Sequence, residues 1–429
     1  MLKFRRTEHC LSDRAEQRTA VLPAHDLDCP ECGMANAVPE LQRGEEASCS
    51  RCGHDLVRVE QRPFALPLSL AAASLVVMLC VYTMKFMVVS TTGVYEYITL
   101  PMMMQTLIVH NFGFLAEVMM LFTFGTPVLM VLLCLYVFYA LAFRRYLPGL
   151  LYATRTLVKI RDWMMVDVFF IATLVAYIKL HSMVEVSFGA AFWLMFVLGV
   201  LLARTAAAVP EHWVYYQIHR LQNQTPMACA DNPQEIMCCS RCLYFRPSEE
   251  VMCQVCGNRL FARRPGSLGI SSAFLLAAFV LYIPANLLPI MITANPAQEE
   301  ISTIMGGIMT MWRSDKLVAA IIFSASILVP SLKIISLATL IAAARFGLPA
   351  SAHTLSRLYR LTEMVGRWSM IDIFVIIILM SAFHTPIVNV SPGPAALYFC
   401  LVVLLTMFSA HFFDPRLLWD KQSEQPENP

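Results

Sequence analysis

Charged residues are scarce in this sequence. Asp, Glu, Lys and Arg together make up 14% of its 429 residues, whereas a soluble domain typically contains about 25%. This shortage argues against an ordinary soluble enzyme. The 32 basic and 30 acidic residues nearly cancel, so the net charge of +2 gives no reason to expect a nucleic-acid partner.

Several functional motifs are also missing. The sequence contains no Gly-x-x-x-x-Gly-Lys-Ser/Thr and no Gly-x-Gly-x-x-Gly, which argues against an internal ATPase or a dinucleotide-binding enzyme. The haem-attachment pattern Cys-x-x-Cys-His does not occur either. Residues 1–62 hold no long apolar run, so we expect the first hydrophobic segment to be a membrane span and not a cleaved signal peptide. We identify no catalytic residue and do not expect an enzyme.

Hydrophobic residues, in contrast, make up 58% of the chain and gather in long runs. A helix needs about 20 mostly apolar residues to cross a bilayer. Eight runs approach or meet this length: 64–84, 118–143, 163–179, 186–203, 267–294, 317–344, 368–390 and 394–413. The sequence therefore predicts an all-α polytopic membrane protein with eight spans.

The distribution of basic residues predicts the orientation of these spans. Arg and Lys are frequent in 144–161, 204–264 and 345–367, whereas 91–113 and 294–315 hold almost none. Positively charged loops stay in the cytoplasm. We therefore expect both termini to be cytoplasmic.

The chain also contains an internal repeat. Trp163-x-Met165-x-Asp167-x-Phe169 recurs 205 residues later as Trp368-x-Met370-x-Asp372-x-Phe374, and a pair of Cys-x-x-Cys sequences precedes each half. Such self-similarity indicates two copies of one unit, a cysteine module followed by four helices, and an even number of spans gives both copies the same orientation. The expected domains are an N-terminal tail with ribbon 1 (1–62), transmembrane module 1 (63–210), ribbon 2 (211–264), transmembrane module 2 (265–415) and a C-terminal tail (416–429).

Eight of the 14 cysteines form the candidate metal sites. Ribbon 1 offers Cys29, Cys32, Cys49 and Cys52, and ribbon 2 offers Cys239, Cys242, Cys253 and Cys256. Four thiolates in two Cys-x-x-Cys pairs are typical of a closed, structural zinc site. We expect one zinc ion in each ribbon. Disulfides are disfavoured because the ribbons lie on the expected cytoplasmic side, and iron is the other metal that this ligand set accepts.

These features together resemble the paraquat-inducible protein A family. The resemblance rests on the two ribbons, the repeated Trp-x-Met-x-Asp-x-Phe motif, Pro284-Ala-Asn-Leu-Leu-Pro289 and Phe413-Asp-Pro-Arg416, and it covers essentially the whole chain. It implies a Gram-negative bacterial inner-membrane protein that works with a periplasm-spanning MCE-domain protein (LetB-like). The implied role is phospholipid traffic between the two membranes, in support of the outer membrane.

Polar residues inside the second module form a candidate transport network. Lys333 lies deep in a predicted span, with Ser326 on the same helical face. Ser369 and Asp372 lie near the cytoplasmic end of the next span, and Thr406 lies inside the last one. A charge in a span is costly and often functional, and we expect Lys333 to extend toward Asp372. The alternative is an ion pair that only locks the helices together.

The fifth span is interrupted by Pro284, Asn286 and Pro289. Proline in a membrane helix frees backbone carbonyls that need internal partners. We expect a kinked helix, which either borders a cavity or is tightly packed.

The sequence leaves three functions open. The first is a lipid-handling subunit that loads or unloads phospholipid at a periplasmic carrier. The second is a membrane redox or quinone-linked protein, and the third is a proton-coupled small-solute transporter that uses Lys333 and Asp372.

Overall fold

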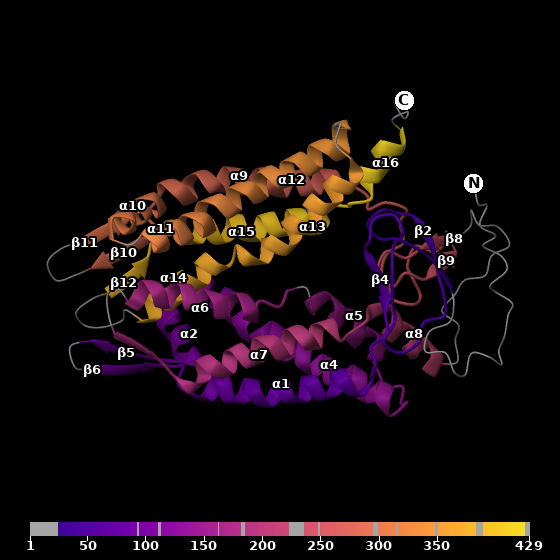
Figure 1. Ribbon diagram of the computed structural model, residues 1–429, viewed down its shortest axis with the longest axis horizontal. Coiled ribbons are helices and arrows are strands. Elements are labelled where there is room, and N and C mark those ends of the chain that lie inside the picture. The colour runs from indigo at the N-terminus through magenta and orange to yellow at the C-terminus, as the bar shows by residue number, and fades with distance from the viewer. Residues whose placement is uncertain are drawn as a thin grey trace.

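Two helical modules lie side by side, with the ribbons at one end and two small β-sheets at the other (Figure 1). We call these the ribbon end and the sheet end. This computed structural model describes residues 25–91, 94–109, 113–161, 163–181, 185–222, 236–247, 249–294, 299–314, 316–347, 351–382 and 389–424.

Both modules follow the same order of elements. Module 1 comprises α1 (Ala65–Thr83), α2 (Leu100–Val109), α3 (Gly113–Met119), α4 (Thr126–Ala142), α5 (Leu150–Arg161), α6 (Val166–His181), α7 (Ala190–Ala207) and α8 (Glu211–Leu221). Module 2 comprises α9 (Ser267–Leu287), α10 (Ile304–Ser314), α11 (Lys316–Phe323), α12 (Val329–Phe346), α13 (Ala352–Trp368), α14 (Ile371–Ala382), α15 (Pro394–Phe412) and α16 (Leu417–Glu424).

Seven helices in the described part of the chain are long and apolar enough to cross a membrane. They are Ala65–Thr83, Gly113–Ala142, Ala190–Ala207, Ser267–Leu287, Ser324–Phe346, Ala352–Ser381 and Pro394–Phe412. The other span expected from the sequence, 163–179, corresponds to α6, which has 16 residues and is about 24 Å long. The mostly helical membrane fold is therefore confirmed, whereas the count of eight spans is not.

The two β-sheets of the sheet end were not predicted from the sequence. Strands β5 (Met87–Thr91), β6 (Val94–Ile98) and β7 (Glu185–Phe188) form one antiparallel sheet in the order β6-β5-β7. Strands β10 (Met291–Ala294), β11 (Glu299–Ser302) and β12 (Asn389–Pro392) form its counterpart in the order β11-β10-β12. The spans expected at 186–203, 267–294 and 368–390 included residues of these strands. That was wrong because hydropathy alone does not distinguish a short apolar strand from the end of a helix.

In each module a glycine brings the third strand close to the chain that enters the sheet. The Gly189 N–H donates to the Phe86 carbonyl at 2.9 Å, and the Gly393 N–H donates to the Ile290 carbonyl at 2.8 Å. A Cβ added at Gly189 would collide with the Lys85 carbonyl, and one at Gly393 would collide with the Pro289 carbonyl. Only glycine fits at these positions.

A π-helical segment precedes a proline in each module. Met120–Gly125 leads into α4 at Pro127, and Ser324–Leu328 leads into α12 at Pro330. Proline lacks the N–H that would bond to the carbonyl four residues earlier, so a wider turn is tolerated there. In module 1 the freed carbonyl is that of Thr123, and the Tyr82 hydroxyl donates to it at 2.7 Å.

The repeated Trp-x-Met-x-Asp-x-Phe motif lies where the modules meet, because α6 packs against α14. The rings of Phe169 and Phe374, equivalent positions of the two copies, meet edge to face with centroids 5.3 Å apart. Met165 and Met370 are fully buried. Equivalent residues contacting each other indicate a two-fold-like relation between the modules.

Candidate functional site: two metal centres and a cavity between the modules

Each ribbon brings four sulfurs together. Ribbon 1 is built on β1 (His25–Asp28), β2 (Ala35–Val38), β3 (Glu46–Ser48) and β4 (Asp55–Arg58), and ribbon 2 contains β8 (Ile236–Cys238) and β9 (Phe245–Pro247). All eight predicted ligands are buried free thiols, and within each ribbon the sulfurs lie within 4.8 Å of one another. The Cys29–Cys52 and Cys32–Cys49 sulfur distances are 3.6 Å. Tetrahedral Zn–S bonds of about 2.3 Å require roughly 3.8 Å between sulfurs, so the geometry fits a zinc-sized ion.

The backbone conformation after each Cys-x-x-Cys turn explains why glycine follows three of the four turns. Gly33, Gly53 and Gly257 have φ between 67° and 70°, the left-handed region that glycine adopts without strain. Their N–H groups donate back to the carbonyls of the first cysteines of their turns, for example Gly53 to Cys49 at 2.9 Å. Leu243 occupies the fourth such position with φ 61°, an uncommon conformation for leucine.

The buried thiols need a cation if all four are to ionise. Burial raises the pKa of Cys52 to about 11. The hydrogen bond from Cys29 lowers the pKa of Cys32 to about 5. Unequal ionisation is expected where four sulfurs share one dry site. A divalent metal would supply the missing charge, and four cysteines leave it no open position for catalysis.

Ribbon 1 docks on module 2 through polar and charged side chains, and its strand β4 also contacts α8 of the module that follows it in sequence. Arg360 of α13 donates to Glu31 at 2.8 Å and to the Cys52 carbonyl at 2.9 Å. Arg51 lies over the ring of Trp419 in α16 at 4.4 Å. Burial alone would raise the pKa of Glu31, but hydrogen bonds from His54 and Arg360 outweigh it and hold this pKa below its ordinary value.

Ribbon 2 docks on module 1 in the equivalent way. His212 of α8 bonds through Nδ1 to the Cys242 carbonyl at 2.7 Å, and its ring stacks on Tyr244. The Arg155 guanidinium lies directly against Gly257. Arg155 and Arg360 are equivalent repeat positions, so each ribbon packs beside the matching arginine of the other ribbon's module. We call this arrangement crossed docking.

We expect Arg360→Ala to loosen ribbon 1 without removing its metal. The guanidinium joins Glu31 to a knuckle carbonyl, and charge-assisted bonds of this kind contribute about 1.5–3 kcal/mol each. Limited proteolysis between ribbon 1 and α1 should accelerate severalfold, with an unchanged metal content. Arg357→Ala, an exposed arginine of the same helix, is the control. Unchanged cleavage in Arg360→Ala would show that this contact does not hold the ribbon.

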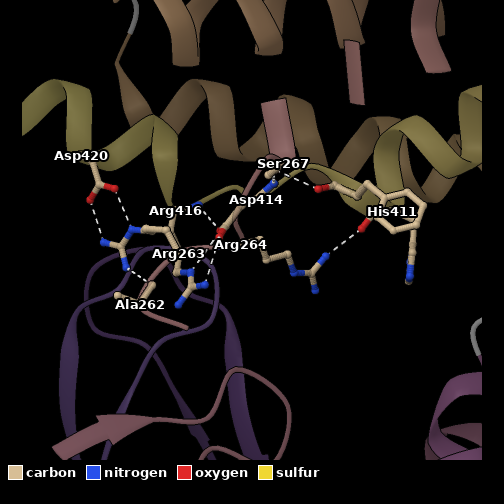
Figure 2. A network of polar contacts seen from close by, with 9 residues as sticks. Ala262, Arg263, Arg264, Ser267, His411, Asp414, Arg416 and Asp420 are labelled. Atoms are coloured by element: carbon tan, nitrogen blue, oxygen red, sulfur yellow. Dashed lines mark hydrogen bonds and ion pairs between the residues drawn. The ribbon is translucent and has the colours of Figure 1, made fainter. Parts of the chain in front are cut away.

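A polar joint links the chain after ribbon 2 to the C-terminal segment (Figure 2). Arg263 makes two hydrogen bonds of 2.7 Å to Asp420, and the Arg264 N–H donates to Asp414 at 3.1 Å. Asp414 also accepts two bonds of 3.0 Å from Arg416, so Phe413-Asp-Pro-Arg416 is a structural joint. Burial alone would raise the pKa of Asp414, but the bonds from Arg416 and Arg264 outweigh it and keep this pKa below its ordinary value.

A cavity of about 590 Å³ lies between the modules at the ribbon end of the membrane helices. Its wall includes Lys333, but Ser326, Ser369, Asp372 and Thr406 are not among its lining residues. Lys333 is 3% exposed, and its ammonium donates to the Gly366 carbonyl at 3.4 Å. Across the described residues Lys333 forms no ion pair, so the expected reach toward Asp372 is not realised.

Of the remaining members of the predicted network, Ser326, Ser369 and Thr406 are buried and Asp372 is half-buried, and they lie on neighbouring elements. Ser326 lies in the π-helical segment before α12, and Ser369 lies just after α13. The Thr406 hydroxyl donates to the Val403 carbonyl of its own helix at 2.9 Å. The structure therefore places these residues in adjacent helices, and it brings only Lys333 to the cavity.

The predicted kinked helix is α9. It runs through Pro284 and ends at Leu287, so Pro289 lies beyond the helix. The Asn286 side chain donates to the Tyr282 carbonyl at 2.8 Å, and the Tyr282 hydroxyl is 2.9 Å from that of Ser331 in α12. None of the three predicted residues lines the cavity between the modules.

Three arginines that line the cavity, Arg161, Arg360 and Arg367, were not predicted as site residues. In the sequence they counted only among the basic residues that predict the orientation of the spans. One signal was available, because Arg161 and Arg367 lie in the last turns of α5 and α13, next to the two copies of the repeated motif. The sequence alone could not show that the two copies face each other.

The sequence of this chain is similar to those of known bacterial proteins. The family model described as Paraquat-inducible protein A matches residues 64–219 and 270–423, one match per module. Intermembrane transport protein PqiA of Escherichia coli K12 is 34% identical over 410 residues, which cover 94% of this chain and 97% of the relative.

Two further relatives are similar over comparable lengths. Lipophilic envelope-spanning tunnel protein A (LetA) of Escherichia coli K12 is 30% identical over 93% of this chain and 92% of its own length. A probable intermembrane transport protein of Haemophilus influenzae is 27% identical over 92% and 96%. Sequence resemblance led us to expect LetA as the nearer relative, but PqiA has the higher identity of the two. No solved structure matches the chain.

Proposed function

Because this chain belongs to the paraquat-inducible protein A family, we propose that it is the inner-membrane subunit of a lipid transport system of the bacterial envelope. In this role it loads or unloads phospholipid at a periplasm-spanning MCE-domain protein. The names of its relatives, which refer to intermembrane transport and to a lipophilic envelope-spanning tunnel, support the proposal.

The observation that carries the proposal is the cavity between the modules. It combines charged side chains with the apolar side chains of Trp163, Met364 and Met407, and it lies among membrane helices. Phospholipids have the same combination of a charged head and apolar chains. Its volume falls in the range of about 300–1,000 Å³ that is usual for ligand sites.

The metal ions and the orientation belong to the same proposal. Each ribbon holds one structural zinc ion, and both ribbons and both termini face the cytoplasm, which leaves the sheet end in the periplasm. The frequency of arginine and lysine toward the ribbon end supports this orientation. A membrane-impermeant thiol reagent should label cysteines introduced in 294–315 but not in 345–347 in intact spheroplasts, and the reverse pattern would refute it.

The test of the function is lipid transfer by the full-length protein. The protein is reconstituted in vesicles with labelled phospholipid, and transfer to a purified MCE-domain partner is followed over time. Co-purification of the partner from native membranes and partner-dependent transfer are the expected results. A haem, flavin or quinone in the purified protein, without transfer, would favour the redox alternative.

We further propose that Lys333 serves lipid passage together with Ser326, Ser369, Asp372 and Thr406. Because Lys333 has no ion-pair partner among the residues that the structure describes, a single substitution separates its functional and structural roles. Lys333→Met keeps the length of the side chain and removes the charge, so the membrane abundance should be retained while transfer is lost. Lys316→Met, at an exposed lysine of α11, is the control. Normal transfer by Lys333→Met would eliminate this role.

A further inference from the structure

Both modules contribute to the wall of the cavity between them. Module 1 contributes the end of α5, the start of α6 and the end of α7, and module 2 contributes α12, α13 and α15. One side of the cavity is lined by the small side chains of Ala203, Ala206 and Ala207 in α7, which fill little of the cavity. The cavity lies at the ends of α7 and α15 that face the ribbons, near the depth expected for lipid headgroups.

The cations of the cavity differ in how they are bonded. Arg161 is bonded to Glu211 at 2.7 Å, and Arg360 is held by Glu31. The Arg367 side chain, in contrast, makes no hydrogen bond or ion pair with any residue that the structure describes. The Lys333 ammonium has three donors and makes one long bond of 3.4 Å. Arg367 and Lys333 therefore have donors available for a ligand.

The cavity also contains two acidic side chains, Asp167 and Glu363, and an apolar part, and Glu363 already has an interaction within the protein. Asp167, in the first turn of α6, lines the cavity and has no hydrogen bond or ion pair within the described ranges. Met164, Met364 and Met407 add flexible apolar side chains, which adapt to irregular ligands. A ligand that satisfies all of these groups has an anion, a cation and an apolar portion.

We propose that this cavity binds the headgroup of an amine-bearing phospholipid from the cytoplasmic leaflet. Arg367 and Lys333 bind the phosphate, Asp167 binds the ammonium, and the methionines contact the start of the acyl chains. Arginine is suited to the phosphate because its planar guanidinium donates two parallel hydrogen bonds. This site rests on the proposed function and adds the lipid class and the side of the membrane from which lipid is taken.

The test is photocrosslinking in the full-length protein. A benzoyl-phenylalanine is placed at Met364, which lines the cavity and is 54% exposed, so that the substitution is tolerated. The protein is reconstituted in vesicles of phosphatidylethanolamine or of phosphatidylglycerol, and lipid adducts are quantified by mass spectrometry. We expect more adduct with phosphatidylethanolamine, and Arg367→Ala should lower the yield about tenfold. Arg367→Lys, which keeps the charge, should retain part of it, and Asp167→Asn should remove the preference between the two lipids.

The controls keep the outcomes distinct. Arg357→Ala, at an exposed arginine of the same helix, should leave the adduct yield unchanged. An equal adduct yield in Arg367→Ala would overturn the site. Equally efficient crosslinking to soluble glycerophosphoethanolamine would overturn the lipid assignment and favour a water-soluble phosphoester. Adduct formation without lipid transfer would count against the proposed function alone, and transfer that is unaffected in Arg367→Ala would count against this site alone.

Discussion

Replacing Gly393 by alanine should deplete the protein from the membrane. The added Cβ would collide with the Pro289 carbonyl and lie 3.3 Å from the carbonyl carbon of Ile290. Both contacts are with backbone, which cannot move aside as a flexible side chain would. The φ of Gly393 is −81°, so any residue can adopt its conformation, and the restriction is one of space.

The collision should propagate because the same carbonyls are hydrogen-bonded. The Ala395 N–H donates to the Pro289 carbonyl at 3.1 Å, which ties the start of α15 to the chain that enters β10. Moving the carbonyl therefore breaks the β10–β12 pairing or the first turn of α15. Overpacking of this kind costs about 1–3 kcal/mol, and more where backbone cannot shift.

The measurement is membrane abundance together with thermal unfolding followed by fluorescence-detected size exclusion. Gly189→Ala, at the matching position of module 1, should behave in the same way because the Lys85 carbonyl lies in its path. The matched control is Gly269→Ala in α9, where an added Cβ meets nothing within 4 Å and alanine favours the helix. Native abundance and an unchanged Tm in Gly393→Ala would contradict the close approach.

Cys49→Ser and Cys253→Ser should each remove one of two zinc equivalents. A structural zinc ion contributes about 10–16 kcal/mol to the folding of such small modules, so losing one of its four thiolates should unfold the ribbon concerned. Crossed docking adds a specific consequence. Cys49→Ser should expose α13 and α16 of module 2, whereas Cys253→Ser should expose α5 and α8 of module 1.

Metal content by mass spectrometry and hydrogen exchange of these helices provide the test. Cys80→Ser, a cysteine of α1 outside both ribbons, should leave two equivalents of zinc and the native exchange pattern. Native exchange of α13 and α16 in Cys49→Ser, or of α5 and α8 in Cys253→Ser, would contradict crossed docking. Two retained zinc equivalents in Cys49→Ser would contradict the ligand assignment.

The sequence predicted the two four-cysteine clusters, the repeat and most of the spans because each leaves a local pattern. The cysteine pairs and the 205-residue offset of the Trp-x-Met-x-Asp-x-Phe motif are read directly from spacing. The sheets were missed because their strands have four or five residues and resemble the apolar ends of helices. The bond from Lys333 to Gly366 and the partners of Arg360 depend on which helices become neighbours, and spacing along the chain carries no such information.

Crossed docking also has a consequence for the ancestry of this architecture. A shorter chain with one ribbon and one four-helix module would leave both its ribbon and its docking arginine without their partners. Two copies of such a chain could exchange ribbons across a two-fold axis, as domain-swapped homodimers do, and every contact would be met. The present molecule has the form of that dimer fused into one polypeptide. Its two halves, produced as separate chains divided within 223–235, should therefore assemble without the covalent connection.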